Sequence, residues 1–298
     1  MPFALIAAPH TPFNAAGGLA PQVVTQQARH LSASGVNGVF LGGTTGECTS
    51  LTTAERLELA AAWAEAAREH RLRMFVHVGH NAQQDALALI EQAVALRADA
   101  VAALAPSYFK PASVRELMAF LEPLVAAASP LPFYYYDIPA LTGVRLSMVE
   151  LLREAARWPN FAGLKYTNPD LIQLQQCLRA AEGRYEILFG VDELLLPARA
   201  LGVAGAVGST YNFAAPHYRR MLAAWDAGDT ETARRLQLEA IDLVEILAAP
   251  GYMAAAKHLM ESLGVPVGGV RPPLTPLTAQ AAETLGPLLN EHPALNSR

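Results

Sequence analysis

The sequence has few cysteines, few charged residues and no long uninterrupted apolar segment. Only two cysteines occur among 298 residues, Cys48 and Cys177, which excludes a disulfide framework and is typical of a reduced, cytoplasmic protein. Charged residues make up 16% of the chain and the net charge is −5, which excludes the basic surface of a nucleic-acid-binding protein. Glycine, proline or charge interrupts every apolar run before the roughly 18 residues that indicate a membrane-spanning helix. The first residues carry no basic segment, so no signal peptide is expected.

Hydrophobic residues make up 52% of the chain, which predicts a globular protein with a sizeable core. Lysine is scarce as well. Only three of the 22 basic residues are lysines, Lys110, Lys165 and Lys257, and the others are arginines. Because this chain uses arginine for most of its positive charge, the isolated Lys165 in the apolar run of residues 161–167 is a candidate for a chemical role.

Short β-type runs alternate with helix-type runs along most of the chain. The expected strands are residues 4–9, 36–43, 74–79, 100–106, 132–139, 161–167, 186–192 and 205–210. Apolar residues at helical spacing lie between them, as in residues 54–69, 82–96, 114–127 and 171–181. Eight strand–helix units predict an α/β protein, a (β/α)8 TIM barrel formed by residues 1–228. A doubly wound open sheet is the alternative, but it usually has fewer strands, and no Gly-x-Gly-x-x-Gly follows the first strand.

Residues 229–298 predict a C-terminal helical extension packed on the barrel as part of the same structural unit. Helices are expected at residues 230–247 and 253–263, with a proline-rich link at residues 266–276. Several helix starts carry capping motifs. Ser/Thr-x-x-Glu capping boxes begin at Thr52, Ser113 and Ser147. Asn168 followed by Pro169 predicts an N-cap with proline at the first helical position.

Active sites of such barrels lie at the carboxyl ends of the strands, and Lys165 is near the end of the sixth. With a two-residue period, Gly163, Lys165 and Thr167 share the face towards the barrel mouth, while Ala162 and its alternating neighbours face the helices. An ammonium held there without a carboxylate has a lowered pKa, and a neutral amine can form an imine with a ketone. A structural lysine paired with an acid across the barrel is the alternative, and position alone does not decide between them.

The fifth strand ends in three tyrosines, residues 134–136. Tyr134 and Tyr136 share one face and Tyr135 the other. Aromatic core filling is the better interpretation of Tyr134 and Tyr135. Tyr136 is nearest the strand end, where a phenol can relay protons to and from a substrate hydroxyl.

The loop after the second strand contains adjacent hydroxyls, Thr44 and Thr45, between glycines in residues 42–47. Side-chain and backbone donors in such a turn can bind a carboxylate. Phosphate is an alternative ligand, but no lysine follows at the spacing of a phosphate-binding loop. A simple tight turn is equally compatible with these residues.

Polar residues also follow the last two strands. Gly190, Asp192 and Glu193 end the seventh strand and Ser209 the eighth, which makes a rim suited to a polyhydroxylated ligand. A metal site at the two carboxylates is the alternative. It is disfavoured because the candidate nitrogen ligands, the histidines at 77 and 80, are three residues apart and face opposite sides of a strand.

Together these segments resemble the dihydrodipicolinate synthase and N-acetylneuraminate lyase family of pyruvate-dependent class I aldolases. Four motifs follow the family order along essentially the whole chain: residues 42–47, the segment around Tyr136, residues 163–165 and the glycine-rich eighth strand. The resemblance is closest to the sialic-acid-cleaving members in residues 132–144, 189–193 and 205–212. The members that form dihydrodipicolinate carry, at the position of Leu141, an arginine that grips the carboxylate of a second substrate. Leucine cannot do this.

The resemblance implies a role for each candidate. Lys165 would be the Schiff-base nucleophile and Tyr136 the proton relay, while Thr44 and Thr45 would hold the substrate carboxylate. The sugar-derived hydroxyls would contact Thr167, Gly190, Asp192, Glu193 and Ser209. Tyr108 falls where the family can place an aromatic residue near a neighbouring subunit's site. Members are commonly tetramers, so a homotetramer is expected.

The implied reaction is reversible cleavage of open-chain N-acetylneuraminate into N-acetylmannosamine and pyruvate, without a metal or organic cofactor. Two alternatives stay open. One is another aldolase or dehydratase of the family that acts on a different 2-oxo sugar acid. The other is a non-catalytic, ligand-sensing barrel, against which the joint presence of Lys165, Tyr136 and both threonines argues. No role is assigned to Lys110.

Overall fold

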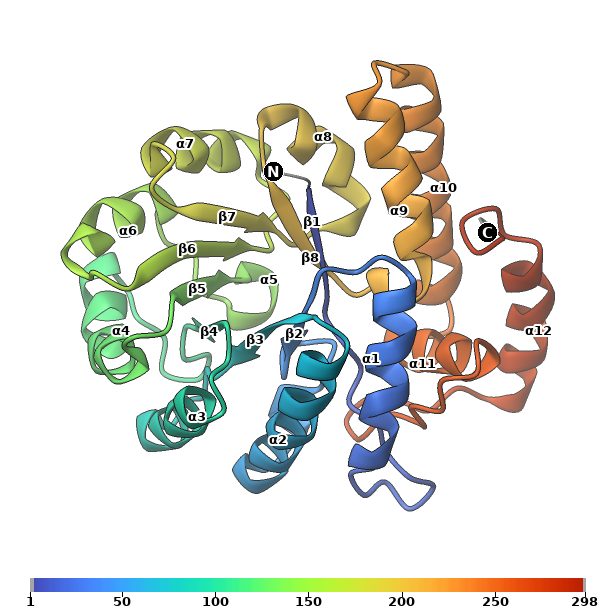
Figure 1. Cartoon of the computed structure of the whole chain (residues 1–298), viewed down its shortest axis with the longest axis horizontal. Coiled ribbons are helices and arrows are strands. Elements are labelled where there is room, and N and C mark those ends of the chain that lie inside the picture. The colour runs from blue at the N-terminus through green and yellow to red at the C-terminus, as the bar shows by residue number, and fades with distance from the viewer. Residues whose placement is uncertain (1–2, 297–298) are drawn as a thin grey trace.

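The computed structural model describes residues 3–296 and contains a closed barrel of eight parallel strands (Figure 1). The strands are β1 (Ala4–Ala7), β2 (Gly38–Leu41), β3 (Arg73–His77), β4 (Ala100–Leu104), β5 (Phe133–Asp137), β6 (Phe161–Tyr166), β7 (Glu186–Phe189) and β8 (Gly205–Gly208). Each strand pairs with the next along the chain, and β8 pairs with β1 to close the barrel. The eight expected strands and the (β/α)8 barrel are confirmed, and the open sheet is excluded.

Helices surround the barrel on its outside (Figure 1). Those that follow the strands are α1 (Val24–Ala33), α2 (Thr53–Glu69), α3 (Gln83–Ala95), α4 (Val114–Ala128), α5 (Pro139–Thr142), α6 (Met148–Glu154), α7 (Leu171–Ala181), α8 (Leu195–Leu201) and α9 (Tyr211–Asp226). Three more follow in the described part of the chain: α10 (Thr230–Ala248), α11 (Tyr252–Ser262) and α12 (Ala279–Asn290). The expected helices agree with these bounds to within one residue at each end. Within the described residues, no helix combines the length and the apolar character needed to cross a membrane.

Two apolar layers explain why the strands read as nearly continuous hydrophobic runs, because both faces of a parallel barrel are buried. The inner layer fills the barrel and includes Ile6, Phe40, Phe75, Tyr134, Tyr136, Leu188 and Val207. The outer layer lies between strands and helices and includes Leu5, Val39, Trp63, Leu121, Tyr135 and Leu164. The expected alternation of the three tyrosines of β5 is therefore confirmed.

The expected alternation of inward- and outward-facing side chains in β6 is wrong at the start of the strand. The register of β5 against β6 shifts there, and Gly163 has a φ of +151°. A Cβ at Gly163 would lie 1.8 Å from the carbonyl oxygen of Glu186, so only glycine fits. The irregularity turns Ala162 towards the inner layer instead of the helices. Beyond it the alternation holds, with Leu164 in the outer layer and Lys165 facing the barrel interior.

Of the four expected helix caps, the one at Thr52 forms as expected, and those at Ser113, Ser147 and Asn168 differ in detail. Thr52 and Glu55 form the complete reciprocal capping box at the start of α2. At Ser113 and Ser147 only half of the box forms, in which the serine oxygen accepts from the amide three residues later. The Glu116 carboxylate accepts from the amide of residue 112 instead.

The N-cap of α7 is Asp170, not Asn168. The Asp170 carboxylate accepts from the amide of Gln173 at 2.9 Å, and its negative charge favours a helix start. The Asn168 side chain instead accepts from the amide of Asp170 at 3.1 Å. This turn leaves Pro169 outside the helix, so the expected proline at the first helical position is wrong.

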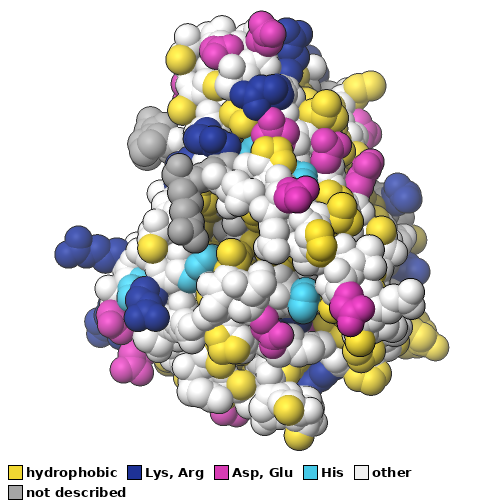
Figure 2. All heavy atoms as spheres, turned by 90° about the vertical axis from the view of Figure 1, so that its right-hand side faces the viewer, with side chains coloured by type: hydrophobic (Ala, Val, Ile, Leu, Met, Phe, Trp, Pro, Cys, Tyr) yellow, Lys and Arg dark blue, Asp and Glu magenta, His cyan; other side chains and the backbone are white. Residues whose placement is uncertain are grey.

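The three C-terminal helices lie on one side of the barrel, outside α9: α10 packs along α9, and α11 and α12 pack against α10 (Figure 1). Acidic, basic and apolar side chains are interspersed over this face (Figure 2). Two ion pairs join this part of the chain to the segment after β2. Lys257 of α11 forms an ion pair with Glu47, and Arg271 forms one with Glu55.

Candidate active site

Lys165 lies at the carboxyl end of β6, and only 4% of its side chain is exposed. Its Nζ lies 3.8 Å from the centre of the Phe40 ring and 4.0 Å from the centre of the Tyr136 ring. Among residues 3–296, no carboxylate forms an ion pair with it. The geometry thus favours the interpretation of Lys165 as a reactive amine over that of a structural ion-pair partner.

The environment of Lys165 favours its neutral form. Burial lowers the pKa of Lys165 to about 7, while the nearby Asp192 carboxylate acts in the opposite direction. A large fraction of this amine is therefore unprotonated near neutral pH. An unprotonated amine is the form that attacks a ketone carbon.

Tyr136 is the neighbour of Lys165 across the pairing of β5 with β6. Its hydroxyl lies 3.2 Å from the Thr44 hydroxyl. Burial raises the pKa of Tyr136 above its ordinary value, whereas the hydrogen bond with Thr44 acts to lower it. The phenol is therefore protonated at neutral pH. It can accept a proton only while it passes its own proton to a neighbour, and Thr44 is in position to take it.

The predicted carboxylate-binding loop lies beside the amine. A Cβ added to Gly43 would lie 3.9 Å from Lys165 Nζ and 3.1 Å from the Phe40 ring, so a glycine lets the loop approach. Thr44 is exposed at the barrel mouth and Thr45 is buried. The Glu47 amide donates to the Thr44 carbonyl at 2.9 Å, which closes a tight turn around the two threonines.

Two residues that support this loop, His77 and Arg56, are not identified by the sequence analysis. His77 Nδ1 lies 2.7 Å from the carbonyl oxygen of Gly42, at the start of the loop. The buried guanidinium of Arg56 donates to the carbonyls of His77 and Gly79. Burial lowers the pKa of His77 far below its ordinary value, so the ring is neutral. The position of His77 at the end of β3 is the sequence signal that points to this contact.

On the opposite wall, Asp192 is buried and firmly held. Its Oδ2 accepts from the Thr210 amide at 3.0 Å and from the Thr210 hydroxyl at 2.6 Å. A Cβ at Gly208 would lie 2.0 Å from Asp192 Oδ1, so glycine makes room for the carboxylate. Burial raises the pKa of Asp192 despite the Thr210 hydrogen bonds.

The other predicted rim residues surround Asp192. Glu193 is partly buried, and burial raises its pKa. The hydroxyls of Ser209 and Tyr252 lie 2.7 Å apart. Tyr252 begins α11, so the C-terminal helices reach the rim of the barrel. Sequence reasoning missed Tyr252 because nothing in the local sequence links α11 to the end of β8.

Thr167 and Gly190 meet at the ends of β6 and β7. The Gly190 amide donates to the Tyr166 carbonyl at 2.8 Å. A Cβ at Gly190 would lie 2.0 Å from Thr167 Oγ1. Glycine at this position therefore leaves space for the threonine hydroxyl, which lies beside Tyr136.

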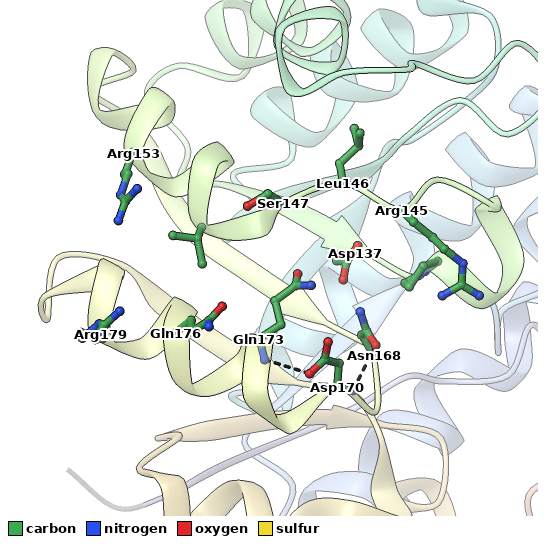
Figure 3. Close-up of a pocket in the computed structure, with 12 residues that line it drawn as sticks. Asp137, Arg145, Leu146, Ser147, Arg153, Asn168, Asp170, Gln173, Gln176 and Arg179 are labelled. Carbon is green, nitrogen blue, oxygen red and sulfur yellow. Dashed lines mark hydrogen bonds between the residues drawn. The ribbon is translucent and has the colours of Figure 1, made fainter.

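A hollow lies elsewhere, between α6 and α7 on the outer side of the barrel (Figure 3). It measures about 580 Å³, and Asp137 and three arginines line it, but none of the predicted substrate contacts does. No cluster of three His, Cys, Asp or Glu side chains that could hold a metal ion occurs in residues 3–296. His80 lies 3.6 Å from Asp85, its ion-pair partner in the described residues, and forms no ion pair with Asp192 or Glu193.

A buried lysine of lowered pKa, a phenol beside it and a threonine turn at the carboxyl ends of barrel strands define the class of Schiff-base, or class I, aldolases and lyases. The chain belongs to the dihydrodipicolinate synthetase family, whose model matches residues 1–292.

Relatives are similar over nearly the full length. N-acetylneuraminate lyase of Danio rerio is 37% identical over 286 residues, which cover 94% of this chain and 93% of that protein. The structure of N-acetylneuraminate lyase from Aliivibrio salmonicida is 38% identical with a TM-score of 0.95, covering 98% of this chain and 97% of that one. The structure of Proteus mirabilis N-acetylneuraminate lyase is 37% identical with a TM-score of 0.92, and the match covers 95% of this chain and 96% of that one.

Proposed function

We propose that this protein reversibly cleaves open-chain N-acetylneuraminate to N-acetylmannosamine and pyruvate through a Schiff base on Lys165. The observation that carries the proposal is the buried amine of lowered pKa in direct contact with Tyr136. The names of the similar proteins supply the substrate.

The reaction begins with attack of the neutral Lys165 amine on the C2 ketone, which loses water and becomes an iminium. The iminium withdraws electrons from the C3–C4 bond. Tyr136 accepts the proton of the C4 hydroxyl as its own proton moves to Thr44, and the exposed Thr44 hydroxyl releases its proton to solvent at the barrel mouth. The bond breaks, the sugar leaves as an aldehyde, and the enamine of pyruvate remains on Lys165. Protonation at C3 and hydrolysis release pyruvate.

The turn of Thr44 and Thr45 binds the carboxylate next to the ketone. Its hydroxyl and amide donors fix that end of the substrate while Gly43 keeps the loop close to Lys165. Holding the ketone near the amine makes their encounter effectively intramolecular, which can lower a barrier by several kcal/mol, on the order of 7–11 at most.

The sugar-derived end of the substrate binds across the opposite wall. Its hydroxyls contact Thr167, Gly190, Asp192, Glu193 and Ser209. The support for this assignment is that these residues surround the mouth of the barrel at the ends of β6, β7 and β8. Asp192 already bonds Thr210, so it offers an oriented acceptor whose position does not depend on the ligand.

Borohydride reduction in the presence of pyruvate tests the Schiff base directly. We expect the mass of reduced pyruvate on Lys165 and none on Lys110 or Lys257, as read by peptide mass spectrometry. Lys165→Ala should abolish both the adduct and pyruvate release from N-acetylneuraminate. An adduct-free wild-type protein, or turnover by Lys165→Ala, would refute the proposal.

The identity of the sugar acid is tested separately, by measuring pyruvate release from a panel of candidate substrates. N-acetylneuraminate should be cleaved more efficiently than 2-keto-3-deoxy sugar acids that lack the N-acetyl group. The reverse preference, with the Lys165 adduct intact, would keep the Schiff-base chemistry but assign another 2-oxo sugar acid as substrate.

The proposal also includes that the protein is a homotetramer and that it is cytoplasmic. The support for self-association is a set of large apolar side chains left exposed on the single chain, namely Tyr108, Phe109, Leu141, Ile172 and Leu238. Two free cysteines are consistent with a reducing compartment. Analytical ultracentrifugation should give four times the mass of one chain, and a monomer at micromolar concentration would contradict the assignment.

A further inference from the structure

Glu47 closes the turn that carries Thr44 and Thr45, and it does so in an unusual backbone conformation. Its φ of +53° and ψ of 38° lie in the left-handed region, which residues other than glycine seldom adopt. The same residue donates the amide hydrogen bond to the Thr44 carbonyl that closes the turn. A strained residue at this point persists only if other contacts hold it.

The Glu47 side chain is held by the C-terminal part of the chain. One carboxylate oxygen lies 2.8 Å from Lys257 Nζ, and both side chains are only 1% exposed. The other oxygen accepts from the Arg271 amide at 2.9 Å, across 224 positions of sequence. Lys257 also donates to the Gly269 carbonyl at 2.6 Å and lies 4.2 Å from the centre of the Phe13 ring.

The two ends of the loop are thus anchored differently. Its start, Gly42, is held by His77 from within the barrel. Its end, Glu47, depends on an ion pair and a backbone amide from α11 and the proline-rich link. A buried ion pair is weak evidence for stability, because apolar residues of similar size often stabilise a fold as well. Its position therefore suggests a role in setting the geometry of the turn.

We propose that Glu47 and Lys257 are positioning residues for the substrate carboxylate, and that their ion pair keeps Thr44 and Thr45 in the turn that receives it. The inference rests on the proposed function, because it concerns the 2-oxo acid end that N-acetylneuraminate and pyruvate share. The pair makes and breaks no bond in the reaction, and it acts only through the two threonines. The C-terminal helices are then part of the active site's support.

The test is a neutral double variant, Glu47→Gln with Lys257→Met, which leaves no buried charge unpaired. Glutamine can still accept from the Arg271 amide. We expect the pyruvate concentration that gives half-maximal borohydride trapping at Lys165 to rise at least about tenfold, as expected for lost orientation of a bound substrate. The KM for N-acetylneuraminate should rise in parallel, with a smaller change in kcat.

Leu259→Ala is the matched control. Leu259 is buried in α11, and its truncation weakens the packing of the same helix without touching Glu47. This variant should lose thermal stability but keep the wild-type half-saturation by pyruvate. A folded double variant with unchanged half-saturation would overturn the proposal. If the double variant does not fold, Lys257→Gln, which keeps a hydrogen-bond donor, is measured in the same way with the same criterion.

Failure of the proposed function has a separate signature, namely a wild-type protein that forms no pyruvate adduct. The positioning role of Glu47 and Lys257 is then tested by amide hydrogen exchange of residues 42–48. Exchange that is faster in the double variant than in Leu259→Ala supports the role of the ion pair, and equal exchange in the two variants overturns it.

Discussion

The Nζ atom of Lys165 lies 4.0 Å from the centre of the Tyr136 ring, and the two residues are direct partners in the pairing of β5 with β6. Backbone hydrogen bonds of the barrel, not a flexible loop, therefore hold the amine and the phenol together. The carboxylate turn and the sugar rim can then vary around a constant pair of reactive groups.

The rate of imine formation at Lys165 should rise with pH and level off above about 7. Only the neutral amine attacks, and burial lowers the pKa of Lys165 to about 7. The measurement is the initial rate of trapping of the pyruvate adduct between pH of about 5 and about 9. Lys110→Arg is the control and should keep the profile. A midpoint near the ordinary lysine pKa of about 10 would contradict the lowered value.

Tyr136→Phe should lower kcat for N-acetylneuraminate cleavage by roughly 10²–10⁴-fold, the usual contribution of a proton-transfer group. Pyruvate should still be trapped on Lys165, because no C4 hydroxyl proton is involved in that step. Tyr134→Phe is the matched control on the same strand and face. Its hydroxyl bonds Glu186 at 2.7 Å, so activity should stay close to that of the wild type. A Tyr136→Phe enzyme within about tenfold of wild type would exclude the relay role.

Glu193→Gln should separate the sugar end of the site from the pyruvate end. Losing a charge-assisted hydrogen bond of about 1.5–3 kcal/mol should raise the KM for N-acetylneuraminate roughly ten- to hundredfold. Half-saturation by pyruvate alone should not change, because pyruvate lacks the sugar hydroxyls. Steady-state kinetics and borohydride trapping measure the two quantities, and an equal loss in both would place Glu193 at the carboxylate end instead.

Asp137→Asn should stabilise the protein at pH 8 but not at pH 4. Burial raises the pKa of Asp137 to about 7, whereas in the unfolded chain it is about 4. Between these values the folded state holds a proton that the unfolded state has lost, so stability falls as pH rises through this range. The variant removes this penalty, which we expect to be roughly 1–4 kcal/mol. Thermal unfolding at the two pH values checks it, and an equal effect at both would be contrary to a raised pKa.

Much of the fold could be predicted because strand–helix alternation is local information. Every expected strand and helix exists, since apolar runs of strand length and helical spacing are written in consecutive residues. The errors occur where a tertiary contact overrides the local pattern. Gly163 bends β6 because the Glu186 carbonyl approaches it, and this turns Ala162 inward. Asp170 takes the cap of α7 because it, and not Asn168, reaches the amide of Gln173.

The sequence by itself determined the barrel, the strand ends and the identity of the candidate amine, phenol and threonine turn. These follow from periodicity and from the rule that strand ends meet at one face of the barrel. Only the tertiary structure decided the state of Lys165, because its pKa depends on burial against Phe40 and Tyr136 and on the lack of a paired carboxylate in the described chain. It also decided that Tyr252 and Lys257 reach the site region, because contacts with residues 43 positions away (Ser209) and about 210 positions away (Glu47) leave no trace in a local pattern.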